Sequence, residues 1–536
     1  MRAVQAELEW RSDEPTRRSR DRAIQIGLHW IGSTGSVDGD SAGAAQQQLW
    51  PADEAQEAEW QMRGRSSMAL ALCFSAIGLS AFPSTETLLL QTTLFVKCVD
   101  WPEYYGLATI TLFVPGLLVQ MLQNRYDRAC NLRFGLRLAM GARLVFGHAI
   151  QLLALLAFFV QLRSDDPEGD GVFVGAVEGK QLLLVVCFAT IGTGCAIVYG
   201  SCTQLVALFP RSHHAFFFIG TYSVSVMLSP VNYLIGDLYD KDTSTMECDR
   251  IHWDRVALFY GIGACCNAVG LFAFVVLVWF TTVGKRQLYN VQQNRHKDVL
   301  EQLLESQKVE HTQSDTERHA ERHTQSASLG AVWRRCFKVG SIMVLSLAQN
   351  LLVCSCYIRL PVSGSIPSLP TVMMYSFYVS QCLGSATVMN ETISRALTTP
   401  VLFVLATLRL PGIFLIMYYT SQSPKDVANG TATFASDWGI FFFFSIYTWI
   451  GGMIFSQSFS LATSLFERTE DRALGASVMN VLYYLGLAVV SGGILLHTQW
   501  LSSAEQLNPD GCVQRRVLTR TMLDLLDGAS HCSGSN

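Results

Sequence analysis

Residues 181–210 read QLLLVVCFATIGTGCAIVYGSCTQLVALFP, a run of 30 residues without Asp, Glu, Lys or Arg. The charged residues Lys180 and Arg211 flank this run. An α-helix rises 1.5 Å per residue, so about 20 apolar residues cross the roughly 30 Å hydrocarbon core of a bilayer. The stretch therefore predicts a transmembrane helix.

Similar runs recur along the chain. An eleventh run is interrupted only by Arg409, which we expect to face a polar interior or a partner rather than lipid. We therefore predict eleven transmembrane helices. The runs are 66–85, 104–124, 144–162, 181–210, 212–236, 256–284, 339–358, 360–390, 396–424, 438–466 and 473–504.

The composition agrees with a membrane protein. Of 536 residues, 50% are hydrophobic and only 15% are charged, against the roughly 25% charged residues of soluble domains. The net charge of −4 offers no basic surface for a phosphate backbone, so we exclude nucleic acid as a partner. The expected environment is the lipid bilayer.

The spans form two groups. Residues 66–284 hold six spans and residues 339–497 hold five, with residues 285–338 as a cytosolic loop between them. Residues 1–65 are too polar to bury a core, so we expect a disordered cytosolic N-terminus. Residues 498–536 form an extracytosolic tail. The predicted fold class is an all-α polytopic membrane protein with a 6+5 arrangement.

Basic residues near span ends indicate orientation, because Lys and Arg gather on the cytosolic side. With a cytosolic N-terminus, 15 basic residues lie inside and eight lie on the short outer loops. An odd span number then places the C-terminus outside. The sequon Asn429-Gly430-Thr431 falls outside as well, so Asn429 is a predicted glycosylation site. We expect a multi-pass protein of the plasma membrane.

Four cysteines, Cys98, Cys248, Cys512 and Cys532, fall on the predicted outer side, where disulfides can form. Sequence alone leaves all three of their possible pairings open. His319 and His323 lie one helical turn apart, but no cysteine is near and a solvated linker explains them. No metal site is predicted.

Signs of catalysis are absent from the sequence. The segment Gly175 to Lys180 lacks the first glycine and the final Ser or Thr of a phosphate-binding loop. No Ser-His-Asp or paired-carboxylate pattern lies in a folded aqueous domain. We therefore expect neither an enzyme nor an ATP-driven pump, and no cofactor.

Ionisable residues at the spans are functional candidates, because a charge is costly inside a membrane. Glu391 and Arg395 lie four residues apart, so on a helix they share a face and can form an ion pair. The alternative is that both mark a membrane boundary.

The fourth span carries Gly192, Ala196 and Gly200 at four-residue spacing. Small residues on one face favour close packing of helices. The polar residues that follow, Ser201 and Thr203 among them, can hold helices together or touch a ligand.

Several of these segments are similar to those of the equilibrative nucleoside transporters, and the resemblance covers most of residues 66–497. Gly78 with Phe82-Pro83 resembles that family's first span, and residues 390–395 resemble its eighth. Further similar segments are Gly200-Ser201 through Leu208-Phe209-Pro210 in the fourth span, and Gly475-Ala476 with Leu485 to Ala488 in the eleventh.

The resemblance implies a major-facilitator-like fold whose halves rock about a central cavity. It also implies a small-molecule substrate, a nucleoside or nucleobase, carried without ATP hydrolysis. Tyr199 would stack on the base, Glu391 would accept hydrogen bonds from ribose hydroxyls, and Arg395 would orient Glu391 or donate to the base. Phe82 and Ser84 would line the cavity.

The sequence departs from the family where ligand contacts are expected. Ser84 and Thr85 stand in place of Trp-Asn, and Tyr199 stands in place of Gln. For Tyr199 and Ser84, helix packing is therefore an alternative role. The alternatives for the whole protein are an amino-acid or other small-metabolite carrier of major-facilitator type, and a non-transporting membrane receptor or scaffold.

Overall fold

The structure is a computed structural model. Its described residues belong almost entirely to the unit formed by residues 69–536. Asn429, the N-terminal segment, most of the loop 285–338 and the end of the C-terminal tail lie outside the described part of the chain. The described residues are 65–90, 104–163, 181–209, 212–234, 239–241, 248–251, 253–293, 329–357, 366, 369–420, 436–466 and 468–507.

Long helices make up the first half of the chain, as the uncharged runs predict. A π-helical turn, η2, follows the last of them, and residues 282–293 are helical again. The elements are α5 (Arg65–Leu79), α6 (Pro83–Leu90), α8 (Tyr104–Phe134), α9 (Leu136–Arg163), α10 (Gln181–Ala207), α11 (Ser212–Leu234), α12 (Trp253–Val275) and η2 (Val276–Phe280).

The second half is also helical. One of its spans is divided at Arg409 into two shorter helices, and a helix of six residues precedes them. The elements are α15 (Leu329–Tyr357), α16 (Leu369–Thr387), α17 (Glu391–Ala396), α18 (Thr399–Leu408), α19 (Leu410–Thr420), α21 (Asp437–Ser464) and α22 (Thr469–Leu507).

The prediction of an all-α polytopic fold is confirmed, with one addition. Two short strands, β1 (Tyr239–Lys241) and β2 (Cys248–Ile251), pair antiparallel between α11 and α12, with Tyr239 opposite Ile251. The polar sequence there predicts a loop. Strands of three and four residues are too short to show the alternation of apolar and polar residues that predicts a strand.

The described residues contain nine or ten candidate spans, against the eleven predicted. Nine helices there are long and apolar enough to cross a membrane, and the bent pair α5 and α6 makes a tenth. The predicted span at 360–390 contains α16, whose residues Ser376, Ser380, Gln381 and Ser385 lower its apolar character. The count of eleven therefore stays a prediction.

Helices extend beyond several of the uncharged runs. α8 continues past Arg125 to Phe134, and α9 begins at Leu136, so only Gly135 separates them. Gly135 has a φ of 79°, a left-handed conformation that glycine adopts without a steric penalty. Charged residues end a run without ending a helix, because a helix can leave the bilayer and continue in water.

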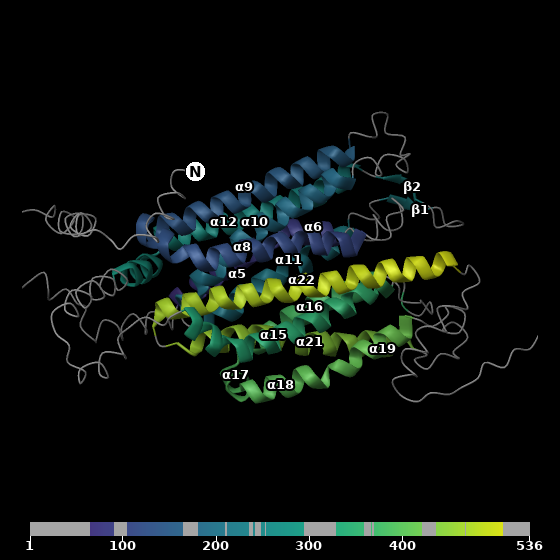
Figure 1. Ribbon diagram of the computed structural model, residues 1–536. Coiled ribbons are helices and arrows are strands. Elements are labelled where there is room, and N and C mark those ends of the chain that lie inside the picture. The colour runs from purple at the N-terminus through teal and green to yellow at the C-terminus, as the bar shows by residue number, and fades with distance from the viewer. Residues whose placement is uncertain are drawn as a thin grey trace, which may run out of the picture. The chain divides into compact units, whose positions relative to one another are not determined.

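The last helix, α22, connects the two halves. It packs against α8 and α10 of the first half and against α15 and α21 of the second. In Figure 1 this yellow helix lies between the blue helices and the green ones. A second contact between the halves joins α11 to α16.

The small residues of α10 serve close packing, as predicted. A Cβ atom added to Gly192 would lie 2.0 Å from the backbone oxygen of Leu112 on α8. The two helices therefore approach closely enough to exclude any side chain at this crossing.

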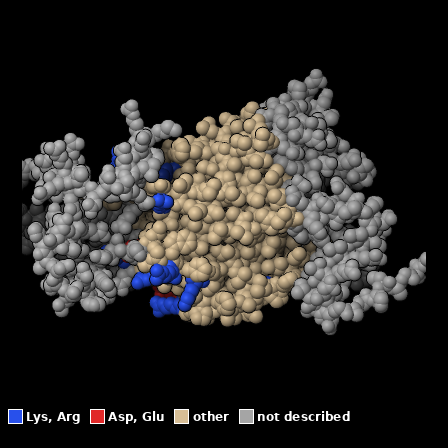
Figure 2. All heavy atoms as spheres, in the orientation of Figure 1, with Lys and Arg blue, Asp and Glu red and all other residues tan. Residues whose placement is uncertain are grey.

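Charged side chains are distributed unevenly over the surface. Lys and Arg gather at one end of the described surface, while the middle of the visible face is largely free of charge (Figure 2). Large apolar side chains are exposed among the described residues, including Leu153, Phe272 and Val489. Such a belt fits contact with lipid, and the basic end fits the predicted cytosolic side.

The α8–α10 crossing can be tested by filling it. We expect Gly192→Ala to lower the free energy of unfolding by about 1–3 kcal/mol or more, because a backbone oxygen cannot move aside as a side chain can. Gly261→Ala is the matched control, since nothing lies within 4 Å of a Cβ at that position. Thermal unfolding of the two purified proteins in the same detergent measures the difference. Equal melting temperatures would contradict the close crossing.

Candidate functional site

The first span is broken where the sequence reads Ser80-Ala81-Phe82-Pro83. The axes of α5 and α6 differ by 50° across this break. Proline lacks a backbone N–H and suits the first turn of a helix, so α6 begins there. The first hydrogen bond of the new helix joins Glu86 N to Phe82 O at 2.9 Å. The surrounding turn is buried inside the bundle.

Glu86 is an acidic side chain that the sequence analysis did not select. The side-chain hydroxyls of Tyr378 and Ser225 face its carboxyl group. Its Oε2 atom is enclosed and accepts no hydrogen bond from the described residues. Within the same residues, no Lys, Arg or His forms an ion pair with it. Among the described residues, Glu86 is thus an acid without a compensating cation.

Helices from both halves surround this carboxyl group. The residues close enough to interact with it electrostatically are Tyr105 of α8, Cys195 of α10, Tyr222 of α11, Cys354 of α15, Tyr378 of α16 and Tyr483 of α22. Although these helices enclose them, Glu86, Tyr222 and Tyr483 each keep some exposed surface. The carboxyl group therefore lies where the two halves meet and where accessible space remains.

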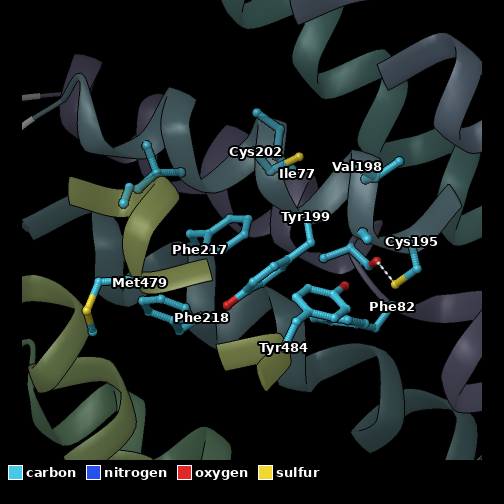
Figure 3. Close-up of a cluster of buried hydrophobic side chains, with 14 of the residues drawn as sticks. Ile77, Phe82, Cys195, Val198, Tyr199, Cys202, Phe217, Phe218, Met479 and Tyr484 are labelled. Atoms are coloured by element: carbon cyan, nitrogen blue, oxygen red, sulfur yellow. Dashed lines mark hydrogen bonds between the residues drawn. The ribbon is translucent and has the colours of Figure 1, made fainter. Parts of the chain in front are cut away.

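A set of aromatic side chains in mutual contact lies near Glu86. The ring of Tyr199 lies 4.8 Å from that of Phe82 and 5.2 Å from that of Tyr483 between centroids. Phe455 lies 5.5 Å from Tyr483 and 6.3 Å from Tyr222. Figure 3 shows the Tyr199 ring beside Phe82, with Tyr484 and Phe217 close by. We call the set Phe82, Glu86, Tyr199, Tyr222, Tyr378, Phe455 and Tyr483 the junction cluster.

Two predicted site residues, Phe82 and Tyr199, are therefore brought together. Tyr199 is only 1% exposed, and its hydroxyl has no hydrogen-bond partner in the described part of the chain. A buried hydroxyl without a partner costs about 1–3 kcal/mol. A phenyl ring without this hydroxyl would fill the same space, so packing does not explain the hydroxyl. Tyr199 therefore remains a candidate for contact with the solute.

Ser84 is placed differently. Its side chain is fully buried, and its hydroxyl accepts a hydrogen bond from Asn267 Nδ2 on α12 at 3.1 Å. Asn267 Oδ1 in turn lies 3.1 Å from Nδ1 of His148 on α9. These contacts hold α6 against α9 and α12 within the first half. For Ser84 they favour the packing role over a place on the cavity wall.

Glu391 and Arg395 form the predicted ion pair, with Arg395 Nη2 at 2.8 Å from Glu391 Oε2. Their side chains are 80% and 79% exposed. They lie on the short helix α17 (Figure 1), toward the end where Lys and Arg gather in the same orientation in Figure 2. The expected burial of this pair at the cavity is therefore corrected. An (i, i+4) pair forms equally well in water, so sequence spacing did not report its depth.

The buried cation of the second half is Arg409. It is 3% exposed and stands between α18 and α19. Its Nη1 donates to Ser346 Oγ at 2.6 Å, and its Nη2 donates to Asn350 Oδ1. The guanidinium carbon lies 4.2 Å from the ring centroid of Tyr447, a cation–π contact. The expectation that Arg409 faces a polar interior is confirmed.

Sequence did contain a signal for Glu86. The residues after it, Thr87 to Leu90, are uncharged and mostly apolar, so a helix could continue beyond it. A single acid between two apolar segments with Pro83 one turn earlier indicates a broken span with an internal carboxylate. The described residues contain no group of three or more His, Cys, Asp or Glu that could hold a metal.

Solved structures resemble this fold. One is the major facilitator superfamily proton:xylose symporter XylE, with 13% identity, coverage of 86% of this chain and 96% of that chain, and a TM-score of 0.50. Another is the fucose:proton symporter FucP of E. coli, with 13% identity, coverage of 85% and 96%, and a TM-score of 0.44. The fold is major-facilitator-like. No family model and no curated protein matches the sequence.

The likeness to XylE extends to the fold alone. At 13% identity, corresponding side chains are too different to transfer a solute or an ion. The candidate site must therefore be judged from its own residues.

The hydroxyl of Tyr199 provides a test of its role. Because it has no partner, we expect Tyr199→Phe to keep or raise the melting temperature of the solute-free protein. We also expect the variant to bind solute more weakly, since a bound solute would lose this hydrogen bond. Melting curves with and without solute measure both effects.

Tyr104→Phe is the matched control. Tyr104 is fully buried, and its hydroxyl donates to Leu88 O at 3.0 Å, so its loss should cost about 0.5–1.5 kcal/mol. The control should therefore melt earlier and bind solute normally. If Tyr199→Phe instead melts earlier and binds solute normally, Tyr199 serves packing only.

Proposed function

We propose that the protein is a secondary transporter that moves a small solute by alternating access, without ATP hydrolysis. The observation that supports this most is the junction cluster, where one unpaired carboxyl group and rings from both halves meet. An ionisable group in the interior of a membrane bundle is costly and commonly marks a solute or ion pathway. Two halves that share a site can open it to either side by rocking.

For the solute we propose a nucleoside or nucleobase. The resemblance in the first, fourth and eleventh spans supports this class. The junction cluster supports it too, because Phe82, Tyr199 and Tyr483 offer rings for stacking on a base. Glu86 would accept hydrogen bonds from ribose hydroxyls or from the base, in the role expected of Glu391.

An amino-acid carrier is the second candidate. Glu86 of the first half, which is partly buried, and Arg409 of the second, which is buried, carry ionisable groups of opposite sign, and neither has a described ion-pair partner. A zwitterion carries an ammonium and a carboxylate that could complement two such groups. Tyr357 and Cys354 link the two regions, because Tyr357 interacts electrostatically with both Cys354 and Arg409.

We further propose that the protein is a multi-pass protein of the plasma membrane with a cytosolic N-terminus. The basic end of the described surface (Figure 2) supports this orientation through the preference of Lys and Arg for the cytosolic side. The proposed glycan at Asn429 belongs to the opposite side.

Uptake into proteoliposomes tests the transport function and the solute class together. The purified full chain is reconstituted, and entry of labelled adenosine, hypoxanthine and an amino-acid mixture is measured against protein-free vesicles. We expect saturable adenosine or hypoxanthine entry that unlabelled nucleosides inhibit and amino acids do not.

Two other results would change the account. Saturable amino-acid entry that nucleosides do not inhibit would replace the nucleoside assignment with the second candidate. If no solute enters faster than into protein-free vesicles, while the protein is folded by its melting curve, the transport proposal fails and a receptor or scaffold is favoured.

A further inference from the structure

We propose that Glu86 exchanges a proton with each side of the membrane in turn and thereby couples solute movement to the proton gradient. This inference rests on the proposed transport function. It assigns a chemical step to a residue that the resemblance did not indicate.

The described surroundings of Glu86 do little to compensate the charge of its carboxylate. A carboxylate inside a bundle is stable only if cations or several hydrogen-bond donors compensate its charge. Glu86 has no described cation partner, and its enclosed Oε2 accepts no hydrogen bond from the part of the chain that the structure describes. Two hydroxyls, those of Tyr378 and Ser225, face the group. Binding a proton is then the simplest way to remove the uncompensated charge.

No group around Glu86 is a better proton carrier. Among the described residues, the titratable groups that interact electrostatically with it are four phenols and two thiols, from α8, α10, α11, α15, α16 and α22. They are Tyr105, Cys195, Tyr222, Cys354, Tyr378 and Tyr483. Phenols and thiols are ordinarily uncharged at neutral pH. They can donate or accept hydrogen bonds, but they leave the carboxyl group as the proton-binding centre.

The remaining helices packed on α6 are α9 and α12. Their buried titratable groups among the described residues are His148, Tyr260 and Cys266, of which His148 lies against Asn267 Oδ1 at 3.1 Å. The Tyr260 ring packs against that of Phe158 at 6.2 Å. His148 is the one other group in this region that titrates near neutral pH in water, so an experiment must separate it from Glu86.

Because Glu86 lies between the two halves, it exchanges its proton with one side of the membrane and then with the other. Tyr222 and Ser225 belong to the first half, whereas Cys354, Tyr378 and Tyr483 belong to the second. Rocking of the halves separates these groups, lets water reach Glu86 from one side and favours the carboxylate. Closure removes the water and favours the neutral acid.

The proposed step forms and then breaks one O–H bond. The carboxylate takes up one proton from the compartment to which the site is open, forming one O–H bond. After the site opens to the other side, that bond breaks and the proton leaves to the second compartment. No oxidant, reductant or other reactant is needed.

The test measures proton and solute movement in the same vesicles. The full chain is reconstituted in liposomes that contain the pH dye pyranine, and labelled adenosine, hypoxanthine or an amino-acid mixture is added outside. Wild-type protein should carry the solute that it recognises and change the internal pH as it does so. In Glu86→Gln, which is neutral and similar in shape, the solute exchange that remains should proceed without a pH change above that of protein-free vesicles. Loss of a solute contact at this position lowers the rate of exchange but not the number of protons moved per solute, so that ratio is the readout.

Two further variants serve as controls. Glu86→Asp retains a carboxyl group and should retain proton movement. His148→Gln removes the other titratable group and should also retain proton movement per solute. Loss of proton movement in His148→Gln, with normal proton movement in Glu86→Gln, would move the role to His148 and overturn the proposal.

The results separate this inference from the transport proposal. Wild-type protein that carries solute without a pH change, or Glu86→Gln that keeps the full pH change, overturns the role of Glu86 and leaves transport intact. Absence of any solute movement in wild-type protein overturns both proposals together.

Discussion

The carboxyl group of Glu86 is the constraint on which the rest of the site depends, because the described residues supply no cation to pair with it. A packed helical interior avoids such a group unless it is used, because two hydroxyl groups do not repay the desolvation of a carboxylate as a cation does. Its position follows from local chemistry: Pro83 restarts the first span at an angle of 50°, and the new helix carries Glu86 inward. The groups that face it, such as Ser225 and Tyr378, come from different halves, so any relative motion of the halves changes its surroundings.

The aromatic residues of the junction cluster also join the two halves. Tyr199 touches Phe82 of its own half and Tyr483 of the other half, so its ring also joins the two halves. α22 brings Tyr483 to this point while it packs on α8 and α15. Elsewhere in the first half, polar contacts such as that between Asn267 and Ser84 hold helices within one half. Contacts within each half favour its movement as a rigid body. Relative movement of the halves then changes the contacts within the junction cluster.

Much of the fold and part of the candidate site could be predicted from the sequence, and each feature that was not predicted has a physical cause. Uncharged runs predicted the helices, and the spacing of Gly192 and its neighbours predicted a close crossing, because both depend on local pattern. The ion pair of Glu391 and Arg395 was predicted, but its 80% and 79% exposure was not, since spacing along a helix does not report depth. Glu86 was missed because it ends an uncharged run, and a charge in that position resembles a membrane boundary. Only the tertiary structure shows that the chain stays inside the bundle beyond it.

The central claim, that the space around Glu86 opens to each side in turn, is tested most directly by sided labelling of Ser225→Cys. This substitution places a thiol of similar size opposite Glu86, in a chain whose native cysteines are replaced and whose transport is retained. The account predicts that a membrane-impermeant thiol reagent reacts with residue 225 from either face, and that bound solute slows both reactions. A thiol that reacts from neither face while transport continues would contradict it.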